Sequence, residues 1–210
     1  MDNDSEKDSG KEWEEYYRKS TPDRLPWERG IPDTNLVELI EKNVIQKGRV
    51  LDICSGLGTQ AIYMAKKGFE VYGIDISPTA VEMAKARGKA EGVACNLGTW
   101  DAVKLKYPFE HFTFVLDRGC FHSIPPEKRE KFIRGVHRVL KRNGKYQMTC
   151  FSYKNGPATN HFTEEDIRKF FSDYFNILSI KEESFEENIS GHKRYFYVAL
   201  MEKKFAFAET

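Results

Sequence analysis

A glycine-containing segment, residues 49–61, constrains the fold of this chain more than any other feature. Its apolar start predicts a buried strand, and Gly56 and Gly58 allow a sharp turn that brings the backbone close to a ligand. Thr59 then begins a predicted helix, and residues 71–75 predict a second buried strand that ends in an acid. This order of strand, glycine turn, helix and acid-ending strand is the layout of a site for an adenosine-containing cofactor.

An acid inside the first predicted strand, Asp52, decides between two kinds of cofactor. Residues 56–61 fit G-x-G-x-x-G/A, and Asp75 follows Gly56 by 19 positions, near the ~20 of a dinucleotide site. A dinucleotide, however, would place its pyrophosphate at the helix N-terminus, where the carboxylate of Asp52 would repel it. S-adenosylmethionine carries a sulfonium and an ammonium but no phosphate, so Asp52 favours it, and Asp75 can accept hydrogen bonds from its ribose. Purely structural roles, as a turn cap and a strand-end acid, remain alternatives.

Four motif blocks, in order between residues 49 and 152, resemble those of class I S-adenosylmethionine-dependent methyltransferases. The family's first block, acid-x-Gly-x-Gly-x-Gly, corresponds here to residues 52–58, with Cys54 at the first glycine position. The second block ends at residues 73–77, and the resemblance makes Asp75 the ribose ligand. It implies that the cofactor is held in this half of the site by Asp52, Gly56, Gly58, Asp75 and Ile76.

The third and fourth blocks extend the resemblance to the two ends of the cofactor. Asp101 and Ala102 stand in the segment that holds adenine in the family, with Asp101 accepting from the exocyclic amine; capping of a loop turn is its alternative role. The fourth block places Asp117 and Arg118 at the methionine end, where strand order reverses. If the acceptor must lose a proton, Asp117 or His122 is the candidate base, with a structural histidine as the alternative.

The pattern of strands and helices predicts one α/β domain, and the resemblance implies a Rossmann-like, seven-stranded, mostly parallel sheet with helices on both faces and a C-terminal antiparallel hairpin. Three parts are expected: a disordered acidic tail (1–12), an N-terminal lid or helical leader (13–47), and the cofactor-binding methyltransferase core (48–210). Helices are predicted at residues 59–67, 79–91, 127–141 and 164–171. Further strands are predicted at residues 93–97, 112–116, 145–151, 175–180 and 195–201.

Three covering segments are expected to determine the acceptor: residues 13–47, 152–162 and 181–193. The Pro-Trp-x-x-Gly pattern around Trp27 resembles the leader of small-molecule thiol, thiopurine and halide methyltransferases and of the tellurite-resistance group. The resemblance implies that Trp27 packs near the methionine part of the cofactor, whereas a plain anchor of the leader on the core is the alternative.

Composition limits the other properties of the chain. A net charge of +1 gives no general electrostatic reason to expect a nucleic-acid partner, and no run of ~18 apolar residues suggests a membrane span. We therefore expect a cytoplasmic monomer or homodimer. The four cysteines lack a C-x-x-C pair and are expected as reduced core thiols; a Cys120 nucleophile would have no identifiable partner base. No histidine and cysteine spacing indicates a metal site.

The expected function is transfer of a methyl group from S-adenosylmethionine to a small-molecule acceptor, such as a thiol, a halide or a metalloid, by in-line displacement. Methylation of a protein or RNA group by the same fold is an alternative. The strand-end sequence Asp117-Arg118-Gly119-Cys120 departs from the Asn/Asp-Pro-Pro-aromatic motif of base-amine methyltransferases, which disfavours that chemistry. A non-catalytic binding module and a nicotinamide oxidoreductase are the two remaining alternatives.

Overall fold

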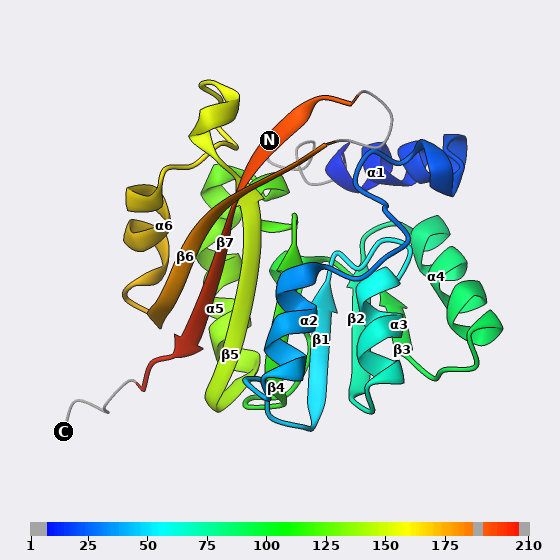
Figure 1. Ribbon diagram of the computed structural model, residues 1–210, viewed down its shortest axis with the longest axis horizontal. Coiled ribbons are helices and arrows are strands. Elements are labelled where there is room, and N and C mark those ends of the chain that lie inside the picture. Colours follow the sequence, from blue (N-terminus) through cyan, green and yellow to red (C-terminus); the bar gives the residue numbers. More distant parts are fainter. Residues whose placement is uncertain (1–7, 187–190, 206–210) are drawn as a thin grey trace, which may run out of the picture.

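Seven strands form one sheet in the computed structural model, which describes residues 8–186 and 191–205 (Figure 1). The strand order is β3-β2-β1-β4-β5-β7-β6. The first five strands in this order run parallel, whereas β7 pairs antiparallel with both β5 and β6, which confirms the expected sheet and its C-terminal hairpin. The strands are β1 (Arg49–Ile53), β2 (Glu70–Asp75), β3 (Asn96–Thr99), β4 (Phe112–Arg118), β5 (Leu140–Phe151), β6 (Phe175–Glu186) and β7 (Lys193–Lys203).

Helices pack on both faces of the sheet and over one end of it (Figure 1). α2 and α3 pack on one face and α5 and α6 on the other, while α1 lies across the carboxyl ends of β1 and β2 and contacts α4. The α-helices are α1 (Asp8–Lys19), α2 (Thr34–Glu41), α3 (Thr59–Lys66), α4 (Pro78–Ala90), α5 (Arg129–Val139) and α6 (Glu164–Phe171). Short 3₁₀ turns are η1 (Pro22–Arg24), η2 (Ala102–Lys104), η3 (Phe121–Ser123), η4 (Pro126–Lys128) and η5 (Tyr153–Asn155).

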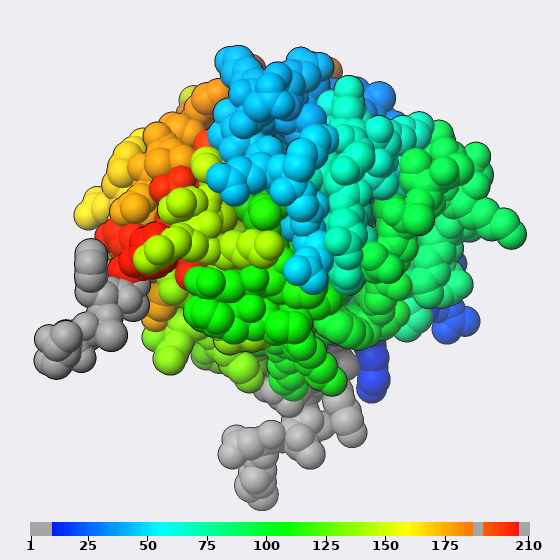
Figure 2. Space-filling view, turned by 90° about the horizontal axis from the view of Figure 1, so that it is seen from below, coloured from blue at the N-terminus to red at the C-terminus, as the bar shows by residue number. Residues whose placement is uncertain are grey.

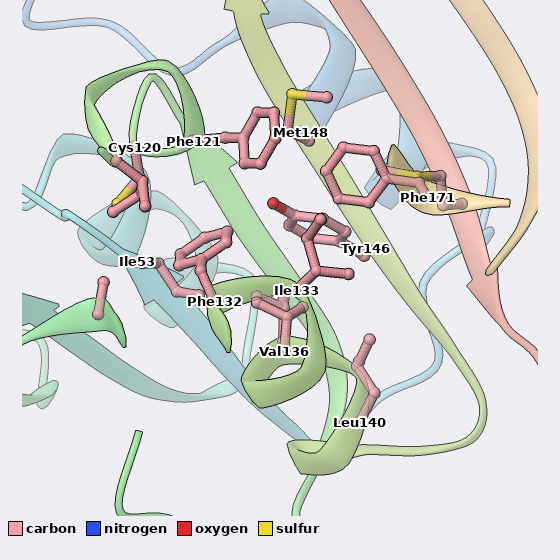
Figure 3. Packing of buried hydrophobic residues seen from close by; sticks show 14 of the residues in the cluster. Ile53, Cys120, Phe121, Phe132, Ile133, Val136, Leu140, Tyr146, Met148 and Phe171 are labelled. Carbon is pink, nitrogen blue, oxygen red and sulfur yellow. The ribbon is translucent and has the colours of Figure 1, made fainter. Parts of the chain in front are cut away.

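Alternation along the central strands divides the core into two clusters. Val50 packs with the cluster under α2 and α3, whereas Leu51 and Ile53 pack with the larger cluster under α5 and α6. Figure 3 shows this larger cluster, with Tyr146 and Phe132 among the aliphatic side chains of α5. Because side chains alternate, an acid on one of these strands faces either the α2 and α3 side or the α5 and α6 side.

Side chains cap the starts of two helices, α4 and α6. Ser77 accepts a hydrogen bond at Oγ from the main-chain nitrogen of Ala80 at 3.1 Å, with Pro78 at the first helical position of α4. Thr163 and Asp166 form a reciprocal capping box at the start of α6. Side-chain capping therefore sets where both helices begin.

Several element boundaries differ from the predictions. The third strand lies at Asn96–Thr99 instead of residues 93–97, and the predicted helix 127–141 divides into η4 and the shorter α5. The strand predicted at residues 145–151 already begins at Leu140, and Asn143 adopts φ 58° inside it. The described part of the connector 181–193 is mostly strand, because β6 and β7 continue as a long ladder toward Glu186 and Lys193.

The N-terminal region is helical from Asp8 onward, within the range 1–12 that the sequence suggests as a tail. Residues 1–7 lie outside the described residues. Within the described part of the chain, no helix has the length and apolarity needed to cross a membrane. Figure 2 views the molecule from below and shows the light-blue segment around α2 beside cyan and green parts of the chain.

The expectation of four reduced cysteines is wrong for one pair. Cys54 and Cys120 form a disulfide between the turns that follow β1 and β4, while Cys95 and Cys150 are free thiols. The two half-cystines lie 66 residues apart in the chain, but β1 and β4 are paired neighbours in the sheet, so the fold brings them together. The sequence has no spacing motif that signals such a long-range pair.

Candidate active site

A cavity of about 350 Å³ lies at the carboxyl ends of the central parallel strands. All three predicted covering segments contribute to its walls: Trp13 and Trp27 from the leader, Asn160 from residues 152–162, and Phe185 from the hairpin. The remaining lining residues are Tyr17, Pro26, Cys54, Asp75, Ile76, Arg118, Gly119, Cys120, His122, Ser123, Thr149, Phe151 and Phe196. Ligands of open α/β sheets bind at this end of the strands.

The glycine turn after β1 is fixed to the end of β2. The main-chain nitrogen of Gly56 donates to Oδ2 of Asp75 at 2.9 Å, and the nitrogen of Ser77 donates to Oδ1 at 3.0 Å. Gly56 and Gly58 have φ values of 51° and 73°, and a Cβ on Gly58 would lie 3.0 Å from the Cβ of Ala84. Both glycines are therefore required by backbone conformation or by packing. Burial also raises the pKa of Asp75.

Cys54 explains why a glycine is common at its motif position. It adopts φ 53°, in the left-handed region that glycine enters without steric cost. The departure from the motif therefore leaves the shape of the turn unchanged, because the cysteine backbone takes the conformation that the family's glycine would take.

Asp52 faces a second, smaller cavity of about 40 Å³ on the α2 and α3 side of β1. Gln60 and Arg118 also line this cavity. Burial raises the pKa of Asp52 to about 8, and its Oδ2 atom has no hydrogen-bond partner within the part of the chain that the structure describes. A buried acceptor without a partner suits a ligand that brings a cationic donor.

Arg118 joins the leader to the core and to the hairpin. Its Nε atom donates to Oδ2 of Asp33 at 3.3 Å, and its Nη1 atom donates to the carbonyl oxygen of Trp27 at 3.2 Å. The guanidinium carbon also lies 5.6 Å from the ring centre of Phe185. Asp33 is not among the predicted site residues, although an Asp directly before a helix start is an N-cap signal. Its Oδ1 atom accepts from the nitrogens of Asn35 and Leu36 at the start of α2.

Asp117 does not line either cavity, which corrects its assignment as a candidate base and cofactor contact. It faces the α5 and α6 side of the sheet, where Oδ1 accepts from the nitrogen of Cys120 at 2.6 Å. Its Oδ2 atom accepts from the nitrogen of Phe121 at 3.1 Å and from the hydroxyl of Tyr146 at 2.9 Å. These donors occupy both oxygens, while burial raises the pKa of Asp117 to about 7. The carboxyl group shapes the turn after β4 and is not available to a ligand, because it is fully buried and lines neither cavity.

His122 lies on the cavity wall with its ring 4.1 Å from that of Phe151. Burial lowers the pKa of His122 to about 3, and two neighbouring cationic or ionisable groups, His161 and Arg129, lower it further. Its Nδ1 atom has no hydrogen-bond partner among the described residues. The imidazole is therefore neutral at physiological pH and offers an unused polar atom beside the cavity.

The segment predicted to hold adenine, which contains Asp101 and Ala102, adopts only part of the expected arrangement. Oδ1 of Asp101 accepts from the nitrogen of Val103 at 2.8 Å and caps η2, as in the turn-capping alternative. Neither Asp101 nor the buried Ala102 lines the two cavities. The nitrogen of Trp100 donates to the carbonyl oxygen of Asp75 at 2.9 Å, so the segment does lie beside the end of β2.

An acid in α1 fastens the leader over the cavity. Oε2 of Glu14 accepts from the hydroxyl of Ser77 at 2.6 Å and the nitrogen of Thr79 at 3.1 Å, and Oε1 accepts from the hydroxyl of Thr79 at 2.6 Å. The carboxylate thus caps the N-terminus of α4 from outside that helix. Next to it, a Cβ on Gly10 would lie 3.2 Å from Cδ1 of Ile76. No local pattern in the sequence pairs Glu14 with residues this far along the chain.

Comparison with known proteins identifies the family. A family model described as a methyltransferase domain matches residues 50–144. An uncharacterized methyltransferase of Schizosaccharomyces pombe is 31% identical over 117 residues, which cover 54% of this chain and 81% of that protein. The chain belongs to the class I S-adenosylmethionine-dependent methyltransferases. Its methyl donor is S-adenosylmethionine.

Two further relatives extend the match beyond the motif blocks. The 2-heptyl-1-hydroxyquinolin-4(1H)-one methyltransferase of Mycobacteroides abscessus is 28% identical over 179 residues, 80% of this chain and 78% of that methyltransferase. A structure described for the conversion of a disulfide bond into a thioacetal group during echinomycin biosynthesis superposes with a TM-score of 0.82. At 23% identity it covers 95% of this chain and 94% of its own, so this methyltransferase shares that fold, leader region included.

Proposed function

We propose that this methyltransferase transfers a methyl group to a small, planar and largely apolar acceptor bound in the 350 Å³ cavity. One observation carries the proposal: a single cavity joins the motif residue Asp75 to the aromatic side chains of the leader and the hairpin. The relative from Mycobacteroides abscessus is named for a small bicyclic acceptor, which supports the same substrate class here.

The residues around the glycine turn fit S-adenosylmethionine, which supplies an electrophilic methyl group on a sulfonium. Asp75 would accept from the ribose hydroxyls, and Ile76 and the turn at Gly56 and Gly58 would lie against the adenosine. The unpartnered Oδ2 of Asp52 supports a cationic ligand, because such a ligand brings a donor and favours the ionised form of the carboxyl group.

Two further predicted cofactor contacts, Trp27 and Arg118, would lie at the methionine end of the cofactor. Trp27 lines both cavities, and so does Arg118, which holds the leader in place through Asp33. Asp101 and Ala102 line neither cavity. They remain candidates for the adenine end because the main chain of the preceding Trp100 is hydrogen-bonded to Asp75. We therefore assign the methionine end of the cofactor to the space between the leader and the carboxyl end of β4.

His122 would position the acceptor. Its neutral ring can accept a hydrogen bond from an O–H, N–H or S–H group and so direct a lone pair toward the methyl carbon. Because its pKa is lowered to about 3, His122 is a weak base, and the acceptor would need an acidic proton of its own. Neutral or anionic oxygen, nitrogen or sulfur nucleophiles on a conjugated ring fit this requirement.

The aromatic wall favours a flat acceptor over an inorganic anion. The rings of Phe185 and Phe196 stack at 4.1 Å with an interplanar angle of 7°, and Phe151 lies 5.0 Å from Phe196. Among the described residues that line the cavity, Arg118 is the only lysine or arginine, and Asp33 already pairs with it. This supports a ring-containing acceptor over the halide and metalloid anions that the sequence also suggested.

The test is a turnover screen in which release of S-adenosylhomocysteine is measured with hydroxyquinolones, phenols, aromatic thiols, iodide and tellurite. Turnover of ring-containing acceptors, with a raised KM but an unchanged cofactor Kd in Phe185→Ala, is the expected result. Leu178→Ala, an exposed position on the same strand, is the matched control. Turnover of the anions alone, or of none of the ring-containing acceptors, would reject the proposed acceptor class.

A further inference from the structure

We propose that the Cys54–Cys120 disulfide is a redox-sensitive modification site that sets the affinity of the cavity for its S-adenosyl ligand. Both half-cystines line the cavity. Cys54 belongs to the glycine turn after β1, and Cys120 belongs to the turn after β4 that also carries His122. The inference rests on the proposed function, because it takes this cavity to be the cofactor site.

The bond connects two turns that the sheet alone places side by side. β1 and β4 are parallel partners, with Ile53 opposite Asp117 at their carboxyl ends, and the paired register ends there. Beyond these residues, the disulfide is a covalent link across the floor of the cavity, with 5.6 Å between the Cα atoms of Cys54 and Cys120. Cleavage would leave each turn to its own local contacts.

Each turn also has hydrogen bonds of its own. The nitrogen of Ser55 donates to the carbonyl oxygen of Ile74 at 2.9 Å, and the nitrogen of Gly58 donates to the carbonyl oxygen of Ser55 at 2.8 Å. On the other side, Cys120 donates to Asp117. Reduction would therefore loosen the spacing between the turns without unfolding either one. A site that loses such preorganisation binds its ligand more weakly, because binding must then order the turns.

The chemistry is an ordinary thiol and disulfide exchange. Cys54 is only partly buried, whereas Cys120 is almost fully buried, so a small dithiol entering the cavity reaches the Cys54 sulfur. Its thiolate attacks that sulfur, and Cys120 leaves as a thiolate that takes up a proton. The second thiol of the dithiol then releases Cys54 as a thiol and closes the oxidised reagent. Two electrons and two protons pass to the protein, and a disulfide oxidant such as oxidised glutathione reverses the step.

The other two cysteines offer a matched comparison. Cys95 and Cys150 are free thiols and do not line the cavity. Cys95 precedes β3 and packs against the first turn of α3, where its sulfur contacts the carbonyl oxygen of Ala61 at 3.7 Å. A Cys95→Ser variant therefore changes the number of thiols without changing the link between the two turns.

The experiment measures S-adenosylhomocysteine binding by calorimetry after treatment of the full chain with oxidised glutathione or with dithiothreitol. Thiol titration in denaturant should find two thiols in the oxidised protein and four in the reduced protein. We expect reduction to weaken binding on the order of tenfold. Cys120→Ser and Cys54→Ser should each bind as weakly as the reduced protein under both treatments, and Cys95→Ser should keep the wild-type difference.

Three outcomes would overturn the inference: four thiols in the oxidised protein, affinities that agree within about twofold between the two treatments, or a difference that persists in both Cys54→Ser and Cys120→Ser. Two variants that break the same bond from opposite sides keep the test valid if one of them fails to fold. Absence of binding in both redox states would reject the proposed cofactor site as well, whereas equal binding would reject this inference alone.

Discussion

The main-chain nitrogen of Gly56 donates a 2.9 Å hydrogen bond to Oδ2 of Asp75, and this bond joins the glycine turn after β1 to the carboxyl end of β2. The same carboxylate receives the nitrogen of Ser77 at the start of α4. One side chain thus shapes three elements of the site, while it also lines the cavity. Removal of the Asp75 carboxylate should therefore weaken cofactor binding by more than the loss of a single hydrogen bond to the ligand.

We expect Asp75→Ala to raise the Kd for S-adenosylhomocysteine more than tenfold. The substitution removes an acceptor for the ribose and leaves the nitrogens of Gly56 and Ser77 without their partner, at about 1–3 kcal/mol for each lost interaction. Isothermal titration calorimetry measures the change. Glu82→Ala, at an exposed position of α4, is the control; equal affinities in the two variants would show that Asp75 has no part in binding.

The affinity for S-adenosylmethionine should rise with pH up to about 8. Burial raises the pKa of Asp52 to about 8, so the carboxyl group is largely protonated at neutral pH, and a cationic ligand favours its ionised form. Binding should therefore release a proton below pH 8, which calorimetry in buffers of different ionisation enthalpy detects. In Asp52→Asn both the release and the pH dependence should vanish, and their persistence would mean that another group titrates.

The same pKa shift predicts a pH effect on stability. The folded-state pKa of Asp52 lies above its unfolded value of about 3.8, so the unfolded chain binds fewer protons between these values and stability falls as pH rises through that window. Thermal unfolding of Asp52→Asn should therefore show its largest gain over the wild type near pH 8 and the smallest near pH 4. A gain that does not depend on pH would contradict the shift.

His122→Ala should lower kcat with little change in the Kd for S-adenosylhomocysteine. The loss removes the proposed hydrogen-bond partner of the acceptor, worth roughly tenfold or more in rate. Because burial lowers the pKa of His122 to about 3, protonation of this ring should not reduce the wild-type rate between pH 5 and 8. Rapid-quench measurement of a single turnover separates the chemical step from binding; an unchanged single-turnover rate would leave His122 a structural residue.

Glu14→Gln should accelerate dissociation of the cofactor several-fold. The charged carboxylate accepts from Ser77 and Thr79 and holds α1 over the cavity, and hydrogen bonds to a charged group contribute about 1.5–3 kcal/mol. Stopped-flow displacement of S-adenosylhomocysteine measures the rate. Glu15→Gln is a matched neighbour whose carboxylate pairs with exposed Lys19 instead, and the same acceleration in both variants would rule out the contact as the cause.

The parts of the fold that depend on local pattern could be read from the sequence, and those that depend on distant contacts could not. The glycine turn, the cap at Ser77 and the capping box at Thr163 carry their signals within a few residues. Asp117 was misassigned because its motif position says nothing about the face to which it points; alternation from Ile53 across the paired strands turns it toward Tyr146.

The leader illustrates the same limit. Its aromatic composition indicated a cover for the site, and Trp13 and Trp27 do line the cavity. The contacts that fix it, however, link Glu14 to Ser77 and Asn35 to Glu183, at separations of 63 and 148 residues. Such pairs follow from the three-dimensional path of the chain, and a single sequence contains no periodicity that reports them.

These separations also have a consequence for the order in which the protein matures. The leader is synthesised before its partners, because those at the start of α4 and in β6 follow it by 63 and 148 residues. A contact cannot form before both of its residues exist, so the leader cannot be fully fastened until synthesis has reached Glu183. Until then the cavity lacks part of the wall that the leader and the hairpin together supply.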